Sequence, residues 1–518
     1  MARRALRASH PARPAPLALA AAIVAAVGAT VATPVLAPLP GGVGALGGKG
    51  VRIRGTTTSR YLELRPFVDD SVPIGAAPGT GGYRTTADGI VVRCTEPETV
   101  CRFKRSGARA SSVPVLQDLE LTAWGLGRGV SFHATGRARA GFGSVPELWP
   151  RATDRFDALE AYLRYDGTRG GAKLGRQWVT SGLGVYNFDG ASVVARPSRW
   201  LTLDAWGGQA LARGTHEPYV SSEIAAVEEL PPDRNALLFG GAVQVRPTRR
   251  SAVRAMWQRE LRANRSGLYS DRIAADGVLR FDRGELDADY EIDLASGQVN
   301  EVRLRGRRDL PAGTSLTVEG RRFRPFFELW TIWGAFSPVG FDEARTDLGW
   351  TTRDRRLALD ARGAYRIWQD AEAGLDFQPL RTRGWRLGGD ALWRASPRWL
   401  ASARYDADVG AGAARSEGDV GVRWEPGDRV YLGALVSAWQ SIFEFRVGTE
   451  RVYGFGLDAG VRLRPDLRVV GDIATYRTDA SRSALTTDWN QRRATLRLEW
   501  SVGGDPGAPA LPRARRAW

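Results

Sequence analysis

The sequence predicts an all-β fold, a single antiparallel transmembrane β-barrel of about 16 to 22 strands. Three observations predict it: alternating apolar and polar residues, connections whose lengths alternate, and an export signal. The alternation is clearest in residues 457–476, LDAGVRLRPDLRVVGDIATY, where apolar side chains recur at every second position around the Pro465-Asp466 turn. A period of two describes a strand with two different faces. Hairpins of this kind recur from about residue 115 to residue 501.

The first residues have the form of a secretory signal. Several arginines precede an apolar stretch from Leu17 to Ala32, which is shorter than the roughly 20 apolar residues of a membrane-spanning helix. We expect residues 1–37 to be removed, with cleavage after Ala37 or, since Pro38 would hinder the peptidase there, after Ala32. No later segment approaches the length of a membrane helix, so residence in a membrane requires strands.

The segment between the signal and the barrel contains two features. Residues 38–82 are rich in glycine and proline, which predicts a flexible lead or a segment inside the lumen. Cys94 and Cys101 follow, within RCTEPETVCR. Because an exported chain meets an oxidising compartment, we expect a disulfide between them. Their spacing, with no histidine nearby, does not suit a redox or zinc pair.

The connections between predicted strands alternate between short and long. The short turns carry proline or glycine, at residues 196–198, 246–248, 310–313, 396–398, 425–428 and 464–466. Longer connections lie near 209–235, 261–272, 323–345, 369–383, 409–417, 441–450 and 479–489. Bacterial outer-membrane barrels have tight periplasmic turns and longer outer loops. The proline turns are therefore expected on the periplasmic side.

The same pattern sets the strand count. About 21 strands follow residue 115. The first connection, Gly125 to Gly129, is short, so a barrel with both termini in the periplasm needs one further strand upstream, either Val51–Leu64 or Tyr83–Arg93. The total is then even, as single-chain bacterial barrels require. We expect the barrel to occupy residues 83–501 and a tail to occupy residues 502–518.

Tryptophans often fall at the ends of predicted strands. Trp385 and Trp393, for example, close the two ends of one apolar face. Aromatic girdles at the two membrane interfaces explain this placement. The last strand ends on Trp500, which resembles the insertion signal of outer-membrane barrels and makes the outer-membrane assembly machinery an expected partner.

The hairpin 286–307 concentrates charge on one face. Its apolar residues occupy the other face, whereas these seven of its charged residues all have odd numbers: Asp287, Asp289, Glu291, Asp293, Arg303, Arg305 and Arg307. Antiparallel pairing can set carboxylates opposite arginines. Facing lipid these charges would cost several kcal/mol, so we expect them to line the pore. They either neutralise each other and brace the wall, or create a transverse field that orients charged solutes.

The connection Arg321–Phe341 is unusually aromatic. Four of its residues, Phe326, Phe327, Trp330 and Trp333, are candidates for a constriction or a ligand loop. An exposed loop this apolar needs a partner. It folds into the lumen, packs on the outer rim, or grips a sugar ring or another apolar ligand by stacking.

Two classes of function are not expected. The net charge is +16, but the basic residues recur singly along the strands, so we expect no nucleic-acid partner. Beyond the signal, only His133 and His216 are available, and no Gly-x-Ser-x-Gly or HExxH motif occurs. An enzyme could still assemble a triad from distant strands. We nevertheless expect no catalytic residues, no cofactor and no metal.

Residues 162–204 carry a resemblance to a known family. The run Leu174-Gly175-Arg176-Gln177, the small-residue loop Ser181–Gly184 and the pair Asp189-Gly190 before a strand that ends at a proline turn are similar to alginate-export-like and related porin-like outer-membrane barrels. The resemblance implies an arginine-rich pore wall that carries anionic polysaccharide. By the same resemblance, Arg176 and Asp189 face the lumen.

These observations predict a porin-like channel in the outer membrane of a Gram-negative bacterium, surrounded by membrane lipid. We expect it to pass small polar or anionic solutes by diffusion. Because 73 lysines and arginines exceed 57 acids, an anion preference is our hypothesis for the pore. The alternative is a closed structural or surface-binding barrel without transport, with its lumen filled by the N-terminal segment and the aromatic loop.

Overall fold

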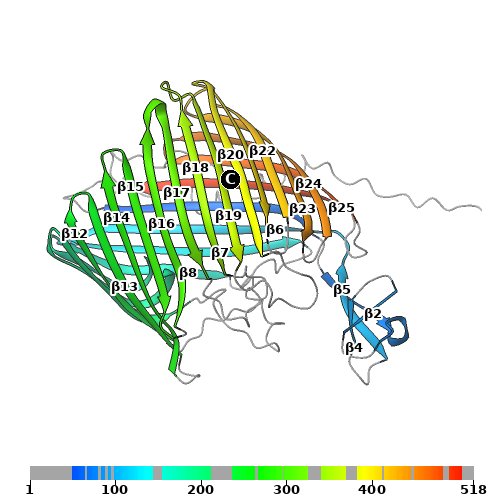
Figure 1. Ribbon diagram of the computed structural model, residues 1–518, viewed down its shortest axis with the longest axis horizontal. Coiled ribbons are helices and arrows are strands. Elements are labelled where there is room, and N and C mark those ends of the chain that lie inside the picture. Colours follow the sequence, from blue (N-terminus) through cyan, green and yellow to red (C-terminus); the bar gives the residue numbers. More distant parts are fainter. Residues whose placement is uncertain are drawn as a thin grey trace, which may run out of the picture.

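Twenty-two strands form one closed antiparallel sheet (Figure 1). The computed structural model describes residues 50–64, 67–79, 83–87, 91–94, 99–143, 155–211, 236–262, 267–295, 297–324, 340–368, 382–410, 414–444, 448–481 and 489–503. The ring closes at β1 (Gly50–Leu64), which pairs with β26 (Trp489–Gly503) on one edge and β6 (Ala110–Gly127) on the other. Closure removes the free edges that would otherwise recruit another chain. The predicted all-β barrel is confirmed.

The remaining strands of the wall pair with their neighbours in chain order. They are β7 (Val130–Gly143), β8 (Phe156–Gly167), β9 (Gly170–Ser181), β10 (Gly184–Ser198), β11 (Leu201–Ala210), β12 (Ala236–Thr248), β13 (Ser251–Arg262), β14 (Gly267–Phe281), β15 (Gly284–Asp293), β16 (Gln298–Leu310), β17 (Thr314–Phe323), β18 (Phe341–Thr351), β19 (Leu357–Trp368), β20 (Arg383–Ser396), β21 (Trp399–Val409), β22 (Ala414–Trp424), β23 (Val430–Glu444), β24 (Gly448–Arg464) and β25 (Leu467–Ser481). The short η4 (Pro311–Gly313) forms the turn between β16 and β17. Among the described residues no helix is long and apolar enough to cross a membrane.

The strand predicted upstream of residue 115 exists and is the first of the two alternatives. β1 covers the predicted range Val51–Leu64 and joins the 21 strands from β6 to β26. The total lies at the upper limit of the predicted range. Its period was hard to recognise because a run of threonines and a serine, residues 56–59, occupies both faces.

The predicted barrel boundary at residue 83 is wrong. Residues 50–64 form β1, which already belongs to the wall, so they are neither a flexible lead nor a segment inside the lumen. The second alternative, Tyr83–Arg93, lies instead in a separate sheet of four short strands. These are β2 (Phe67–Pro73), β3 (Tyr83–Thr85), β4 (Val91–Cys94) and β5 (Val100–Ser106), with η1 (Ile74–Ala76) after β2. The local sequence pattern did not reveal the change from one sheet to another, because polar connections lie on both sides of these strands.

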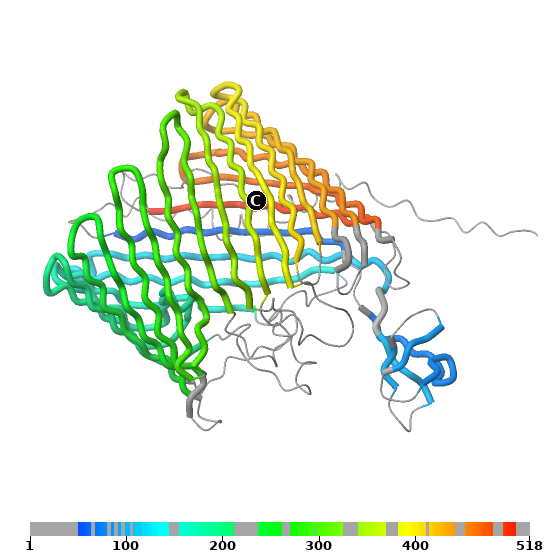
Figure 2. Tube along the Cα trace, viewed as in Figure 1, coloured from blue at the N-terminus to red at the C-terminus, as the bar shows by residue number. Residues whose placement is uncertain are grey.

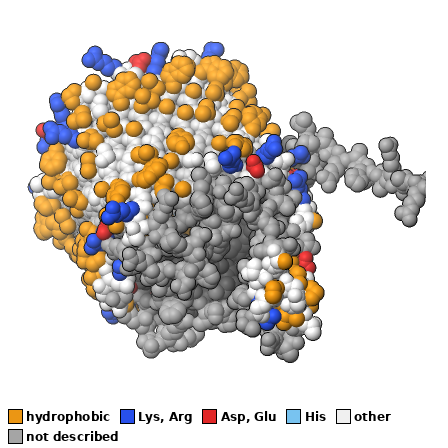
Figure 3. Space-filling view, turned by 45° about the vertical axis from the view of Figure 1, so that its right-hand side comes forward, with side chains coloured by type: hydrophobic (Ala, Val, Ile, Leu, Met, Phe, Trp, Pro, Cys, Tyr) orange, Lys and Arg blue, Asp and Glu red, His pale blue; other side chains and the backbone are white. Residues whose placement is uncertain are grey.

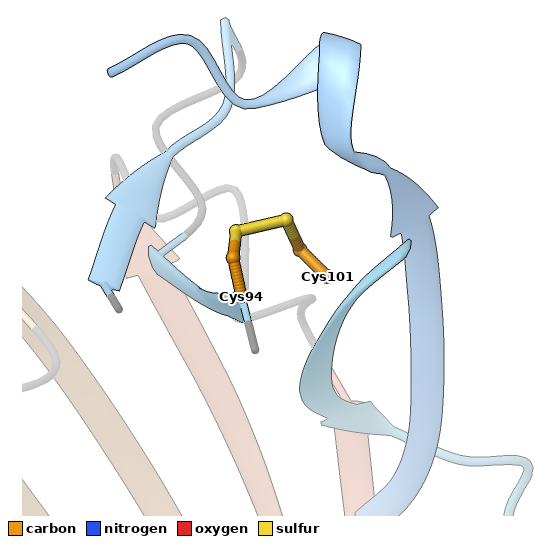
Figure 4. The surroundings of a disulfide bond; sticks show 2 residues. All are labelled: Cys94 and Cys101. Carbon is orange, nitrogen blue, oxygen red and sulfur yellow. A yellow bond between two sulfur atoms is a disulfide. The ribbon is translucent and has the colours of Figure 1, made fainter. Parts of the chain in front are cut away.

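This small sheet is held by the predicted disulfide, which is confirmed. Cys94 and Cys101 are bonded and buried with Ala77 and Val92 (Figure 4). The sheet interrupts the β1–β6 hairpin, in which Leu64 pairs directly with Ala110. It projects from the end of the barrel at which the longer connections lie (Figure 2).

All the predicted proline turns lie at one end of the barrel. They join β10–β11, β12–β13, β16–β17, β20–β21, β22–β23 and β24–β25. Successive turns in this series are two or four strands apart, so parity puts them all on the same side. At the opposite end the length rule holds only in part. Only Gly182 and Leu183 separate β9 from β10 there, and connections of three or four residues join β13–β14, β15–β16, β21–β22 and β23–β24.

The outer wall is apolar, as a lipid-facing surface must be. Hydrophobic side chains spread over the wall, and many of the charged ones lie toward its margins (Figure 3). Trp393, Trp399 and Trp424 share the outer face near the short-turn end, because Trp399 pairs with Trp424 and Trp393 with Ala401. Most strands thus carry mainly apolar residues outward and mainly polar residues inward.

Candidate functional site

The charged hairpin of β15 and β16 pairs as the sequence predicts. Asp287 lies directly opposite Arg305, and Asp289 opposite Arg303. Both pairs are ion pairs, with N–O distances of 2.9 Å and 2.7 Å. Leu304, which lies between Arg303 and Arg305, and Leu286, next to Asp287, are exposed on the other face. Because side chains alternate along a strand, the ion pairs belong to the inner face of the barrel.

The other members of this set have local partners on the same inner face. Glu291 accepts hydrogen bonds from Arg272 of β14 and from Asn300, at 2.9 Å and 3.1 Å. Arg307 lies 3.5 Å from Asp309 at the short-turn end. Asp293 is buried at the opposite end of β15 and accepts a hydrogen bond from the Ala295 N–H. The charges therefore extend along the whole length of this wall segment.

The ion-pair network continues across the neighbouring strands. Its densest node is Arg362 of β19, which donates to both carboxylate oxygens of Asp406 at 2.9 Å and 3.0 Å, and also to Asp390. Arg404 donates to the same Asp406 at 2.6 Å, and Asp360 lies 3.7 Å from Arg362. Register places all five side chains on the inner face, opposite in sense to the exposed Leu359 and Tyr405. Sequence reasoning missed this node because its members come from three strands.

A second sector of the inner face is mainly basic. Arg468 and Arg497 share Glu499, and Arg462 lies directly opposite Arg468. By register the same face of β24, β25, β26 and β1 also carries Arg493, Arg52, Arg54 and Arg60, with Asp458 and Asp472 as its other acids. The excess of arginine here gives the lumen an asymmetric charge.

A hairpin tip folds over the inner face of the barrel at the long-connection end. Leu183 is buried against Trp206 and Met256, in a cluster with Phe188, Leu238, Ala210, Ala242 and Ala274. Arg272 holds the tip, because it donates to the Leu183 carbonyl at 2.9 Å and to the Tyr186 hydroxyl. Register places these cluster residues on the same inner face as Asp204 and Arg254. The sequence signal was a short Gly-Leu-Gly connection where the length rule requires a long one.

Arg176 and Asp189 do not face the lumen, and this prediction is wrong. They pair directly, joined by two hydrogen bonds of 2.9 Å. Asp189 also lies opposite Gln209, on the face of the exposed Leu203 and Val193. The buried Phe188 takes the inner face instead. An outward ion pair is tolerated because each charge satisfies the other, and Arg176 also donates to the Ala158 carbonyl at 2.9 Å.

Of the two candidate histidines, the structure describes His133. It lies on the inner face, with Nδ1 3.2 Å from the Thr122 hydroxyl and Nε2 3.2 Å from Glu160. His216 lies outside the described residues, as do the loop candidates Phe326, Phe327, Trp330 and Trp333. The expected signal, residues 1–37, and most of the tail also lie outside them.

A closed strand ring, an apolar exterior and a charged interior together define a transmembrane β-barrel of the bacterial outer membrane. Several solved porin structures share features of this fold. The crystal structure of OpdO from Pseudomonas aeruginosa is 11% identical and covers 88% of this chain and 97% of its own, with a TM-score of 0.38. A BenF-like porin from Pseudomonas fluorescens Pf-5 is 9% identical and covers 87% and 99%, with a TM-score of 0.40.

OccAB4 from Acinetobacter baumannii is 8% identical and covers 88% and 98%, with a TM-score of 0.38. These values are too low for the likeness to carry an argument about solute or site. No protein-family model and no curated protein matches the sequence. The resemblance to alginate-export-like barrels therefore gains no support from these comparisons.

Proposed function

We propose that the protein is a diffusion channel that passes small polar or anionic solutes through a lumen lined by arginines and carboxylates. One observation carries the proposal: the same strands that present leucine outward present ion pairs inward, as Leu304 and Arg305 do on β16. Partly exposed charges at this density need water, because an ion moved into a dry interior costs several kcal/mol. A wet, charged passage through an apolar wall is the arrangement of a channel.

The proposed preference for anions rests on the basic sector of β24, β25, β26 and β1. There arginines outnumber acids, whereas in the network around Arg362 three aspartates surround two arginines. An anion would follow the basic sector and a cation the acidic one. The two sectors together produce a field across the lumen, which favours solutes that carry both charge and dipole.

The constriction we propose is the hairpin tip at Leu183, in addition to the aromatic loop predicted from the sequence. The tip combines an apolar surface with the ion pair of the buried Arg272 and the partly buried Glu291, whose N–O distance is 2.9 Å. A rigid projection of this kind would select solutes by size before they meet the charged wall.

Planar-bilayer recordings of the full-length protein test the proposal. We expect open-channel conductance and, in a salt gradient, a reversal potential on the anion side. A cation-selective pore would overturn the anion preference, and a sealed barrel would favour the structural alternative. A deletion of residues 38–82 would remove a wall strand, so the proper test of an N-terminal obstruction is a deletion that ends at Gly48 and spares β1.

A further inference from the structure

The outer wall from β18 to β24 contains a groove with a floor of small residues. The cavity measures about 930 Å³. Its floor is formed by alanines and glycines of five successive strands, β19 to β23: Ala361, Gly389, Ala391, Ala403, Gly418 and Ala438. Leu348, Leu359 and Trp350 flank it on one side, and Val436 and Tyr453 on the other.

The strands at the two margins of the groove fix its side of the wall. β18 contributes Leu348 and Trp350 but not the intervening Gly349, and β24 contributes Arg451 and Tyr453 but not Val452. Because alternate residues of a strand face opposite sides, the cavity lies on the outer face. Leu348, Tyr405 and Tyr453 are each about half exposed there. The groove therefore opens toward the membrane.

The groove has a direction across the membrane. Trp350 lies one residue from the end of β18 at the short turns, whereas Arg451 lies three residues from the end of β24 at the longer connections. Gln440, directly opposite Arg451, lines the same end. The apolar groove thus runs from the aromatic residues near the short turns to a polar, cationic end in the outer leaflet.

Two arginines mark that end. Arg451 lines the groove, and Arg477 of β25 lies directly opposite Tyr453, on the same outer face. Among the described residues, no carboxylate lies within ion-pair distance of either arginine. Asp479, opposite Arg451, does not reach it. Two other outward arginines, by contrast, are paired with aspartates, in Arg176–Asp189 and Arg322–Asp342.

We propose that this groove is a binding site for one membrane lipid with a phosphate-bearing, anionic headgroup. The acyl chain lies over the alanine and glycine floor, where the absence of large side chains leaves room for it. The phosphate accepts hydrogen bonds from Arg451 and Arg477, since guanidinium and phosphate match in geometry and charge. The unpaired charge favours a lipid over a second copy of the barrel, which would bury both arginines against an apolar wall.

Native mass spectrometry of the full-length protein in detergent tests the proposal, with phosphatidylglycerol as the anionic probe and phosphatidylethanolamine as the zwitterionic one. We expect a single phosphatidylglycerol to remain bound preferentially. The double variant R451Q/R477Q should bind it about 30-fold more weakly, since each interfacial arginine contributes about fivefold. The variant A403F/A438F, which fills the floor, should lose binding of both lipids.

Two controls separate a specific site from general effects. R322Q removes an arginine that is already paired on the outer face, and A205F adds a ring to the outer face of the far wall; both should bind as the parent does. Heat-modifiable gel migration verifies that every variant is a folded barrel. Equal retention of both lipids by all variants overturns the proposal, as does an oligomer of this chain that A403F/A438F dissociates.

Discussion

Replacing Arg362 by glutamine should make the channel more permeable to cations. The arginine donates to Asp390 and Asp406 and lies 3.7 Å from Asp360, so it is the centre of the acidic sector. With Arg404, the cluster holds two positive and three negative groups, a formal charge of −1. R362Q changes this to −2 while it keeps a hydrogen-bonding side chain. D406N changes it to zero and should act in the opposite direction.

The magnitude follows from Coulomb's law in the wet lumen. A unit charge about 7 Å from the ion path contributes about 0.6 kcal/mol in water, roughly halved by screening at 0.1 M salt. The cation gains this energy and the anion loses it. The ratio of anion to cation permeability should therefore fall about threefold in R362Q and rise about threefold in D406N.

Reversal potentials across planar bilayers in a salt gradient measure both ratios. R322Q is the matched control, because it removes the same charge from the outer face, where Arg322 pairs with Asp342, and should leave selectivity unchanged. The effects of R362Q and D406N should vanish in molar salt, where the screening length falls to about 3 Å. If the two variants shift selectivity in the same direction, or if R322Q shifts it equally, the cluster does not face the ion path.

Three further predictions concern the fold. Replacing both Cys94 and Cys101 by alanine should destabilise the small sheet by about 2.5 kcal/mol, the loop-closure value for this short ring, while channel conductance stays unchanged. Faster proteolytic cleavage between residues 67 and 106 measures the loss of stability. An equal loss of stability in the barrel would show that the small sheet and the barrel are not independent. Leu183→Gly should raise single-channel conductance, because it removes the side chain that the hairpin tip buries against Trp206 and Met256; unchanged conductance would show that the tip does not limit flow. Leu304→Arg places a charge in lipid and should destabilise the barrel by about 2 kcal/mol in urea unfolding from lipid vesicles. The change Arg303→Leu at the neighbouring inward position removes a charge and places none in lipid. If the two variants had the same conductance and the same ion selectivity, the assignment of these residues to opposite faces would be wrong.

Local alternation accounts for most of what the sequence could predict. Within a hairpin, the period of two fixes which residues share a face, so residues 286–307 alone predict carboxylates opposite arginines. The exact partners, Asp287–Arg305 and Asp289–Arg303, depend also on a register shift between Glu291 and Ile292. The same reasoning required a strand upstream of residue 115, since a closed ring with both ends on one side needs an even number. It could not assign that strand's neighbours, because β1 pairs with β26 across more than four hundred residues of sequence.

The errors arose where the inner or outer sense of a strand depends on distant residues. Arg176 and Asp189 form the expected pair, but alternation alone does not say which face is inside. The pairing of β10 with β11 decides which face is inside, because Asp189 lies opposite Gln209 on the same face as Leu203. Phe188 and the apolar hairpin tip occupy the inner face. The node at Arg362 was missed for a related reason, since its partners Asp390 and Asp406 lie on two further strands.

By itself, the sequence determined the class of protein, the strands, the disulfide and the side on which the proline turns gather, because each of these depends on residues close together in the chain. Only the tertiary structure decided the closure of the ring through β1, the separate small sheet, the inward hairpin tip and the orientation of Arg176. These depend on which strand lies beside which around a complete ring, and a local pattern of period two is the same for every such arrangement.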